Sequence, residues 1–325
     1  MRRGIKFLSE KTLNIDELRS AVTDFDSLHA SQYPQIITDY FRYYGIDFES
    51  QFSGLQHFFG AIDCGAYRIT SHYFSLAGKP ASKTVLIVHG YYDHVGLYKH
   101  AIANSLAQGY NVVAFDLPGH GLSSGERSCI VRFGEYQLVL KAIIAYFEKI
   151  NIPIAALIGQ STGAAIVMQY LLEHPQQNRA AVMLAPLLKV YQWRSSRLLY
   201  RLVKNFIKRL PRRFANNSHD KNFIYFLKYQ DPLQSKYTHL DWVGALIEWV
   251  EEFKYFKATR HKVLIVQGLA DSTVDWRINI PAINKKLPCA KIGYIDGAGH
   301  QLVNETEVMR QQVFILINQY LSEHS

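Results

Sequence analysis

Short runs of consecutive hydrophobic residues recur along the chain from residue 85 onward, and most are separated by stretches long enough to form a helix. The runs lie at residues 85–88, 112–115, 155–158, 181–184, 263–266 and 292–295. A short apolar run without polar alternation is typical of a strand buried on both faces. Such strands alternating with helices predict a mostly parallel central sheet covered by helices, the α/β class.

Different patterns precede these runs. Asn14 is a candidate helix cap, and apolar residues follow it at helical spacing at Leu18, Val22, Phe25 and Leu28. A second helical pattern lies between Pro34 and Gly45. Residues 58–74 alternate between two faces and contain Gly60 and Gly65 as breaks, which predicts short antiparallel edge strands. We therefore expect an N-terminal helical segment at residues 1–57.

The alternation of strands and helices is interrupted once, between Pro186 and Lys262, by a segment much longer than a crossover needs. Hydrophobic residues in this segment keep helical spacing, so we expect residues 187–260 to form an inserted helical cap, or lid. The core would then consist of residues 58–186 and 261–325.

Charge is concentrated in the same segment. The chain has a formal net charge of +9, and nine Lys and Arg residues lie between Lys189 and Arg213 without an acidic residue among them. Residues 198–210 also carry apolar side chains at helical spacing, which predicts a basic amphipathic helix. Such a helix can lie on an anionic membrane, or it can pack on its own domain with a solvated basic face. No nucleic-acid-binding motif accompanies the charge, so nucleic acid is not expected as a partner.

The cysteines and the chain start exclude other classes. Cys64, Cys129 and Cys289 are widely spaced, which indicates buried reduced thiols rather than a disulfide framework or a zinc site. Residues 1–10 lack the apolar core of a signal peptide, and no apolar stretch is long enough to span a membrane. We expect a cytoplasmic protein, with peripheral contact at the inner membrane surface as a further expectation.

The chemistry-bearing motif is G-x-S-x-G at residues 159–163, directly after a predicted strand and before a helical pattern. In this motif a serine stands on a tight strand-to-helix turn, where glycines two residues to either side leave room for the backbone. The pattern predicts Ser161 as a nucleophile.

A serine nucleophile needs a base, and the base needs a carboxylate that orients it. In a parallel sheet such groups gather at the carboxyl ends of strands. Asp271 and His300 each follow one of the last two strands, and they give the order serine, acid, histidine. Asp275 lies near enough to compete with Asp271, and Asp296 also ends a strand.

Backbone N–H groups at two further strand ends are candidates for binding the oxyanion. They belong to Tyr91, after Gly90, and to Thr162, at the start of the helix behind Ser161. For His94 we favour a loop-ordering hydrogen bond over a role as a second base. Residues 116–127 are rich in turn formers but lack the end of a phosphate-binding loop, so we expect a structural loop that borders the active site.

Together these motifs make the chain similar to the monoacylglycerol lipase and lysophospholipase group of the α/β-hydrolase fold. The group's characteristic segments correspond to stretches that begin at His89, Asp116, Gly159, Gly268 and Gly297. The chain departs from the usual residues at three positions, with Asp93 for Glu, Gln160 for His and Thr162 for Met. The resemblance implies an α/β-hydrolase fold and a serine ester hydrolase.

The expected reaction is hydrolysis of carboxylic esters of monoacyl lipids, a lysophospholipid or a monoacylglycerol, through an acyl-Ser161 intermediate. Aromatic residues of the cap are available to line an acyl tunnel: Tyr191, Trp193, Phe223, Tyr225, Phe226, Trp242 and Trp249. The alternatives are a carboxylesterase or thioesterase for short soluble substrates and a non-catalytic protein that binds membrane surfaces. Residues 89–93 are H-G-Y-Y-D, whereas proline-specific aminopeptidases of this fold usually have H-G-G-P-G there. This difference disfavours a peptidase. No cofactor, metal or protein partner is predicted.

Overall fold

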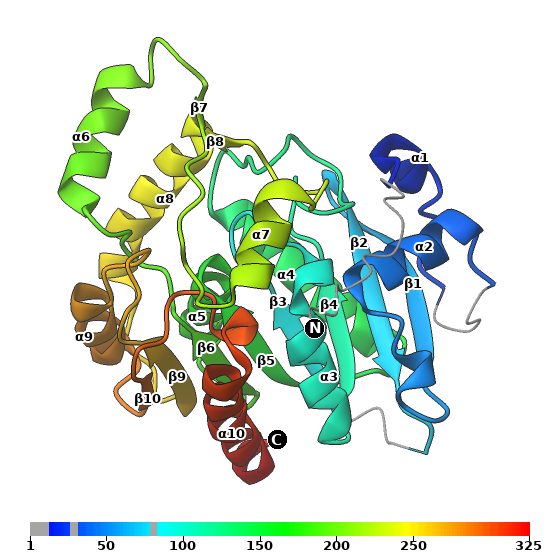
Figure 1. Ribbon diagram of the computed structural model, residues 1–325. Helices are drawn as coiled ribbons and strands as arrows, with labels where there is room; N and C mark the ends of the chain where they lie inside the picture. Colours follow the sequence, from blue (N-terminus) through cyan, green and yellow to red (C-terminus); the bar gives the residue numbers. More distant parts are fainter. Residues whose placement is uncertain (1–12, 27–31, 79–82) are drawn as a thin grey trace, which may run out of the picture.

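The described residues form one large twisted sheet with helices on both faces, and a second sheet of two strands (Figure 1). The computed structural model describes residues 13–26, 32–78 and 83–325. The sheet has eight strands in the order β1-β2-β4-β3-β5-β6-β9-β10. Their bounds are β1 Gln56–Cys64, β2 Tyr67–Ser75, β3 Thr84–Val88, β4 Asn111–Phe115, β5 Ile154–Gln160, β6 Ala180–Leu184, β9 Val263–Gly268 and β10 Lys291–Ile295.

The six strands from β3 to β10 in this sheet pair in parallel, which confirms the prediction from the hydrophobic runs. Successive residues of one strand serve two cores: Leu86 and Val88 face one, whereas Val85 and Ile87 face the other. One core is covered by α4 (Gly134–Lys149), α5 (Thr162–Glu173) and α9 (Trp276–Lys286), and the other by α3 (Lys99–Ala107) and α10 (Glu307–His324). Burial of each such side chain stabilises the fold by about 1.5–3 kcal/mol.

Strands β1 and β2 form an antiparallel hairpin at one edge of the sheet, as expected. The expectation that Gly60 breaks a strand is wrong, because Gly60 lies inside β1. A Cβ atom there would lie 2.6 Å from the Cα of Phe25, where the N-terminal chain crosses β1 and bridges Asp24 to Ala61. The glycine thus permits a close backbone approach, which is a common reason for glycine within a strand.

The N-terminal segment contains two helices, α1 (Ile15–Ser20) and α2 (Gln35–Tyr44), and the short 3-10 helix η1 (Phe48–Ser50). Asn14 caps α1 as expected, but the helix ends at Ser20, so its predicted continuation through Phe25 is wrong. Tertiary pairing with β1 outweighs the helical pattern there. Leu28, the last residue of this helical pattern, lies outside the described residues. Residues 1–10, in which no signal peptide is expected, also lie outside them.

Residues 185–262, named here the insertion, connect β6 to β9 and lie above the sheet in Figure 1. They contain α6 (Trp193–Val203), β7 (Arg209–Pro211), α7 (Lys221–Tyr229), β8 (Tyr237–His239), α8 (Leu240–Glu252) and the 3-10 helix η3 (Phe253–Tyr255). The predicted helix at 198–210 is displaced, because it begins earlier and ends at Val203. Its last residues instead pair with β8, and this pairing forms a small second sheet.

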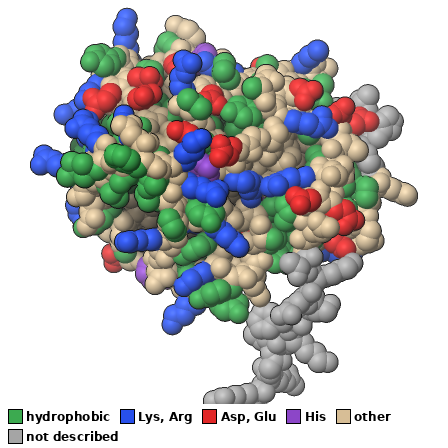
Figure 2. All heavy atoms as spheres, turned by 90° about the horizontal axis from the view of Figure 1, so that it is seen from above, with side chains coloured by type: hydrophobic (Ala, Val, Ile, Leu, Met, Phe, Trp, Pro, Cys, Tyr) green, Lys and Arg blue, Asp and Glu red, His purple; other side chains and the backbone are tan. Residues whose placement is uncertain are grey.

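One face of α6 and the turn after it is apolar and exposed. Phe206 is 84% exposed, and Leu198, Leu199 and Leu202 are each about half exposed or more. Exposed basic side chains lie among them at Arg194, Arg201, Lys204 and Lys208. We call these eight residues the α6 surface. Figure 2 looks down on this side of the molecule and shows Lys and Arg side chains beside hydrophobic ones. Packing of these apolar residues on their own domain, one of the two alternatives, is therefore not what the structure shows.

None of the helices in the described ranges combines the length and the apolar character that a membrane crossing requires.

Candidate active site

Ser161 stands on a strained turn between β5 and α5. Its backbone has φ 54° and ψ −112°, a conformation unusual for a residue with a side chain. A Cβ atom on Gly163 would lie 2.1 Å from the carbonyl oxygen of Val88, and one on Gly159 would lie 2.5 Å from the backbone of Gly163. Only glycine fits at both positions. The strand, turn and helix required by the motif are all present.

The structure brings Ser161, His300 and Asp271 together. The Nε2 atom of His300 lies 2.9 Å from the Oγ atom of Ser161, and its Nδ1 atom lies 2.8 Å from Oδ2 of Asp271. The other carboxylate oxygen accepts the backbone N–H groups of Thr273 and Val274, which hold it in place. All three site residues are largely buried. Of the three candidate carboxylates, Asp271 is the one bonded to His300.

Charge couples the members of this chain of hydrogen bonds. Burial opposes protonation of His300, but the carboxylate of Asp271, with a smaller effect from Asp93, raises its pKa above the ordinary value. Burial likewise opposes ionisation of Asp271, yet the His300 ring and hydrogen bonds from Thr273 and Gln267 lower its pKa. The pair therefore favours a carboxylate beside an imidazole that readily accepts a proton.

Tyr91 and Thr162, the two candidate donors for an oxyanion, line the same cavity as Ser161 and His300. Thr162 is the first residue of α5, so its N–H belongs to a helix turn that leaves donors without partners in the helix. The Tyr91 ring stacks on Trp242 of the insertion with 3.7 Å between ring centroids, and its hydroxyl donates to the carbonyl of Ser128. Tyr91 is thus held from both the core and the insertion.

The cavity at Ser161 has a volume of about 300 Å³, and more apolar than polar surface faces it. Its apolar lining includes Leu187, Val190, Trp193, Trp242, Val243, Leu246 and Ile247, and its basic lining consists of Arg197, Arg212 and Arg213. Only two of the aromatic residues proposed for an acyl tunnel, Trp193 and Trp242, line it. Trp249 is buried in the core, and Tyr191 is exposed.

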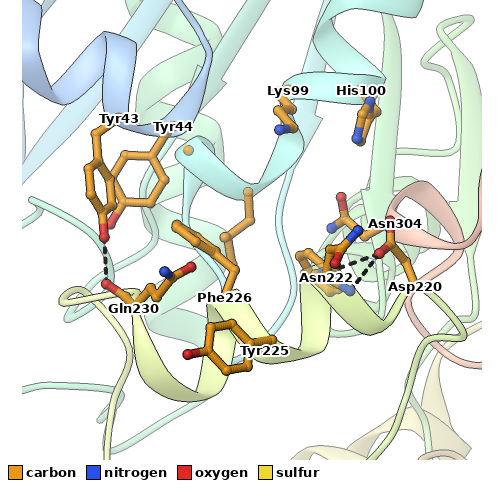
Figure 3. Close-up of a pocket in the computed structure, with 13 residues that line it drawn as sticks. Tyr43, Tyr44, Lys99, His100, Asp220, Asn222, Tyr225, Phe226, Gln230 and Asn304 are labelled. Atoms are coloured by element: carbon orange, nitrogen blue, oxygen red, sulfur yellow. Dashed lines mark hydrogen bonds between the residues drawn. The ribbon is translucent and has the colours of Figure 1, made fainter. Parts of the chain in front are cut away.

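The remaining aromatic residues of that set, Phe223, Tyr225 and Phe226, line a second cavity of about 400 Å³ between α2, α3 and α7. Figure 3 shows Tyr43 and Phe226 on one side of it and Lys99 and His100 above it. None of the residues that line it is Ser161, Asp271 or His300. This second cavity therefore lies apart from the candidate active site.

Sequence reasoning missed a buried polar network under the Ser161 turn. Gln160 donates to Gln301 at 2.6 Å, and Gln301 donates to Asp93 at 3.1 Å. Asp93 accepts from Tyr98, whose hydroxyl accepts the backbone N–H of Gly90. The network joins the residue before Ser161, the residue after His300 and the turn that carries Tyr91. The only local signals were the departures from the usual residues at 93 and 160.

The insertion is bonded to the loop that carries His300. The backbone carbonyl of Asn217 accepts the N–H groups of both His300 and Gln301, at 3.0 and 2.9 Å. Buried Glu305 accepts the backbone N–H groups of His219 and Gly299. The position of His300 therefore depends on residues of the insertion as well as on β10.

His94 forms a loop-ordering bond, as expected. Its Nε2 atom lies 3.0 Å from Asp231 of the insertion, and Asp231 also accepts the hydroxyl of Tyr44 at 2.7 Å. The loop at 116–127 supports the same region, because Asp116 accepts the backbone N–H of Val95 at 2.8 Å. Residues 116–127 do not line the cavity at Ser161, but they border the candidate site as expected, because the ring of His120 lies 5.5 Å from that of Tyr91 between centroids.

Replacing Asp231 with asparagine is expected to lower the free energy of unfolding by about 3 kcal/mol, because both side chains of the pair are fully buried. Burial opposes the charge on both groups, but the attraction between them outweighs this effect. The pKa of His94 is therefore raised, and the pKa of Asp231 is lowered. The pair therefore stabilises the fold most between about pH 4 and 6.5, the ordinary values of the two groups. This stabilisation is lost as the pH rises through the raised pKa of His94, and it is lost as the pH falls through the lowered pKa of Asp231.

Urea unfolding of both proteins across this pH range measures the effect. The matched control is Glu173→Gln, which removes a carboxylate from the partly exposed pair with Lys141 and should cost less than about 1 kcal/mol. Equal losses in the two variants would contradict a special role for the buried pair.

The sheet order, the turn at Ser161 and the carboxyl-end placement of Asp271 and His300 define an α/β-hydrolase fold. Within this class, the chain belongs to the hydrolase family described as serine aminopeptidase, S33, which matches residues 79–307.

Relatives of known structure share this fold. A monoglyceride lipase from Saccharomyces cerevisiae superposes with a TM-score of 0.69 at 18% identity, covering 82% of this chain and 94% of that one. A monoacylglycerol lipase from Paleococcus ferrophilus gives 0.66 at 23% identity, covering 79% and 99%.

Among curated relatives, a monoacylglycerol lipase from Mycolicibacterium smegmatis is 32% identical over 104 residues, 31% of this chain and 37% of that protein. The chain spans only between 11% and 40% of the length of the first curated relatives that it matches.

Proposed function

We propose that this protein hydrolyses carboxylic esters of monoacyl lipids through an acyl-Ser161 intermediate. The observation that carries the proposal is the chain of hydrogen bonds from Asp271 through His300 to Ser161, which ends in a mostly apolar cavity. An apolar cavity suits an acyl chain better than a peptide. Similarity to lipases named for monoacylglycerols supports the same substrate class.

In the proposed first step, His300 Nε2 takes the proton of Ser161 Oγ as this oxygen attacks the ester carbonyl. The N–H groups of Tyr91 and Thr162 bind the oxyanion that forms. Collapse of this intermediate expels the alcohol, which receives the proton from His300. Water then attacks the acyl-serine with His300 as base, and the fatty acid leaves. Asp271 keeps the ring oriented and stabilises its protonated form.

Between the two expected substrates, the basic lining of the cavity favours a lysophospholipid. The guanidinium of Arg212 lies 3.9 Å from the ring centroid of Tyr92 and 4.4 Å from that of Phe214, and it also donates to Gln234. These contacts hold the group in place at the wall of the cavity. A fixed guanidinium suits a phosphate, with which it forms two charge-assisted hydrogen bonds.

The proposal includes contact with an anionic membrane through the α6 surface, with the insertion acting as the lid. Its exposed apolar side chains would enter the interface, and its basic side chains would attract anionic head groups. Trp193 and Arg197 of the same helix line the cavity at Ser161. A lipid that leaves the membrane beside α6 would therefore pass directly to the site.

A substrate panel tests the proposal. A lysophospholipid is expected to be hydrolysed roughly ten- to hundredfold faster, in kcat/KM, than a monoacylglycerol with the same acyl chain, because charge-assisted hydrogen bonds contribute about 1.5–3 kcal/mol. Arg212→Met should remove most of this preference, whereas Arg260→Met, at an exposed position, should retain it. Initial rates on matched micelles give both comparisons.

Other outcomes would redirect the assignment. Equal rates on the two lipids would contradict the phosphate preference alone. Faster turnover of short p-nitrophenyl esters or thioesters would support the carboxylesterase or thioesterase alternative, and cleavage of an aminoacyl p-nitroanilide would favour a peptidase.

A further inference from the structure

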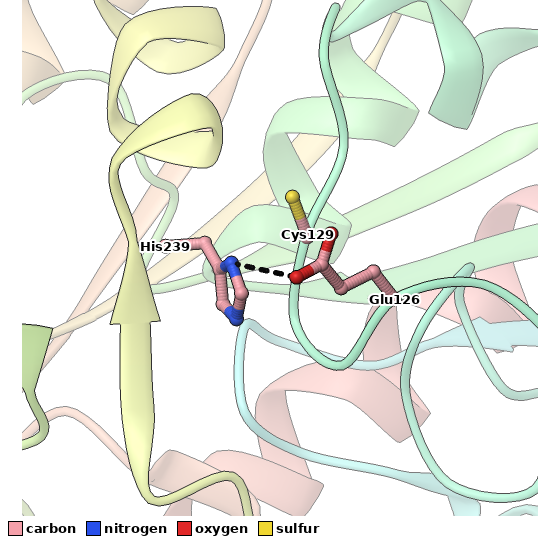
Figure 4. Close-up of side chains that lie close together, drawn as sticks. All are labelled: Glu126, Cys129 and His239. Carbon is pink, nitrogen blue, oxygen red and sulfur yellow. Dashed lines mark ion pairs between the residues drawn. The ribbon is translucent and has the colours of Figure 1, made fainter. Parts of the chain in front are cut away.

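Glu126, Cys129 and His239 lie together although they are far apart in the sequence. One donor atom of each residue, a carboxylate oxygen, the thiol sulfur and a ring nitrogen, lies within 4.8 Å of the other two. Glu126 and Cys129 belong to the loop between β4 and α4, and His239 is the last residue of β8 in the insertion. Figure 4 shows the three side chains converging, with His239 Nδ1 3.5 Å from Glu126 Oε1.

We propose that these three side chains form a binding site for a divalent transition metal of the zinc type. Sulfur, imidazole nitrogen and carboxylate oxygen are the donors that Zn²⁺ takes in proteins. Metal–ligand bonds of about 2.0–2.3 Å require donor atoms to lie within about 4 Å of one another, so only small side-chain movements are needed. Three protein ligands leave the fourth tetrahedral position to water.

Burial of the three ligands fits a metal that enters from solvent. Cys129 and His239 are 6% and 4% exposed, so surrounding protein restricts the movement of their side chains. The Glu126 side chain is 69% exposed, so it is free to close on an ion from outside.

The surrounding charge also suits a cation. The carboxylates of Glu126, Asp241 and Glu135 place negative charge near Cys129. A bound cation would offset both the burial of a thiolate and the repulsion from these carboxylates.

The position gives the metal a structural consequence. Two ligands come from the core and one from the insertion, so the ion would fasten the insertion to the core. The hydroxyl of Tyr91 donates to the carbonyl of Ser128, which lies between the two core ligands in the chain. The site therefore lies beside the residue whose N–H we assign to the oxyanion. The inference rests on neither the substrate nor the triad.

Co²⁺ titration of the full-length, metal-free protein tests the proposal, because Co²⁺ replaces Zn²⁺ and reports a cysteine ligand by a thiolate charge-transfer band. We expect one equivalent to bind with this band, and Zn²⁺ to displace it. Cys129→Ser should abolish the band. The matched controls Cys64→Ser and Cys289→Ser, which change the two other free cysteines, should retain it.

Glu126→Gln provides a variant at an exposed side chain, so its folding is not in question. It should weaken Zn²⁺ binding by at least the roughly 10- to 100-fold that loss of a supporting group costs at metal sites. Zn²⁺ should also raise the thermal unfolding midpoint of the wild type more than that of Glu126→Gln.

No band in the wild type, a band that depends on Cys64 or Cys289, or unchanged Zn²⁺ affinity in Glu126→Gln would each overturn the proposal. None of these measurements uses enzymatic activity, so their failure is distinct from failure of the proposed reaction.

Discussion

Ser161→Ala is expected to lower kcat for ester hydrolysis by about a millionfold, the loss measured when a serine nucleophile of this type is removed. The reason is that the variant loses the oxygen that lies 2.9 Å from Nε2 of His300 and would attack the substrate. The fold should not change, because the hydrogen bond of the Ser161 hydroxyl within the described part of the chain is to His300, and the strained turn keeps its two glycines.

Labelling with a fluorophosphonate probe and turnover of a lysophospholipid measure this result. The wild type and Ser322→Ala, an exposed serine on α10, should label and turn over equally, whereas Ser161→Ala should do neither. Undiminished turnover in Ser161→Ala would exclude it as the nucleophile. A wild type that binds liposomes but does not label would favour the non-catalytic membrane-binding alternative.

Asp271→Asn is expected to lower kcat/KM by about ten thousandfold. The amide cannot hold the His300 ring in the tautomer that accepts the serine proton, nor can it stabilise the imidazolium. The pH profile gives a second readout. Ester hydrolysis needs neutral His300, so activity should fall as pH drops through the raised pKa of His300 in the wild type. Without the carboxylate that raises it, this inflection should move to lower pH.

The measurement is kcat/KM against pH for the wild type, Asp271→Asn and Asp275→Asn. Asp275 is the matched control, because it lies after the same strand but is not the carboxylate bonded to His300. An unchanged inflection in the pH profile of Asp271→Asn would show that Asp271 does not raise the pKa of His300. A comparable loss of kcat/KM in Asp275→Asn would contradict the assignment of the orienting role to Asp271.

The parallel sheet could be predicted because burial on both faces leaves a local record, an unbroken apolar run, at each strand. The grouping of the candidate site residues could be predicted for a related reason: the carboxyl ends of parallel strands lie along one edge of the sheet, so the residues after β5, β9 and β10 lie on the same side of it. Ser161, Asp271 and His300 were found at these ends without any knowledge of their distances.

What could not be predicted depends on contacts between segments far apart in the chain. The pattern after Asn14 is helical, yet pairing with β1 ends the helix at Ser20. The aromatic residues of the insertion divide between two cavities, the core and the exposed surface, and their spacing along the chain does not show which of these each residue meets. His239 gives no local sign that it meets Cys129.

The hydrogen bonds that the backbone carbonyl of Asn217 accepts from His300 and Gln301 have a consequence for protein engineering. A chimera that grafts a foreign insertion onto this core would also replace the carbonyl group that orients the backbone at His300. Exchanging the whole insertion between relatives, with junctions at the end of β6 and the start of β9, should therefore lower turnover. The loss is expected even for substrates that fit the new cavity. Exchange of α6 alone would leave residues 217–219 in place, so it offers the better crossover for redesign.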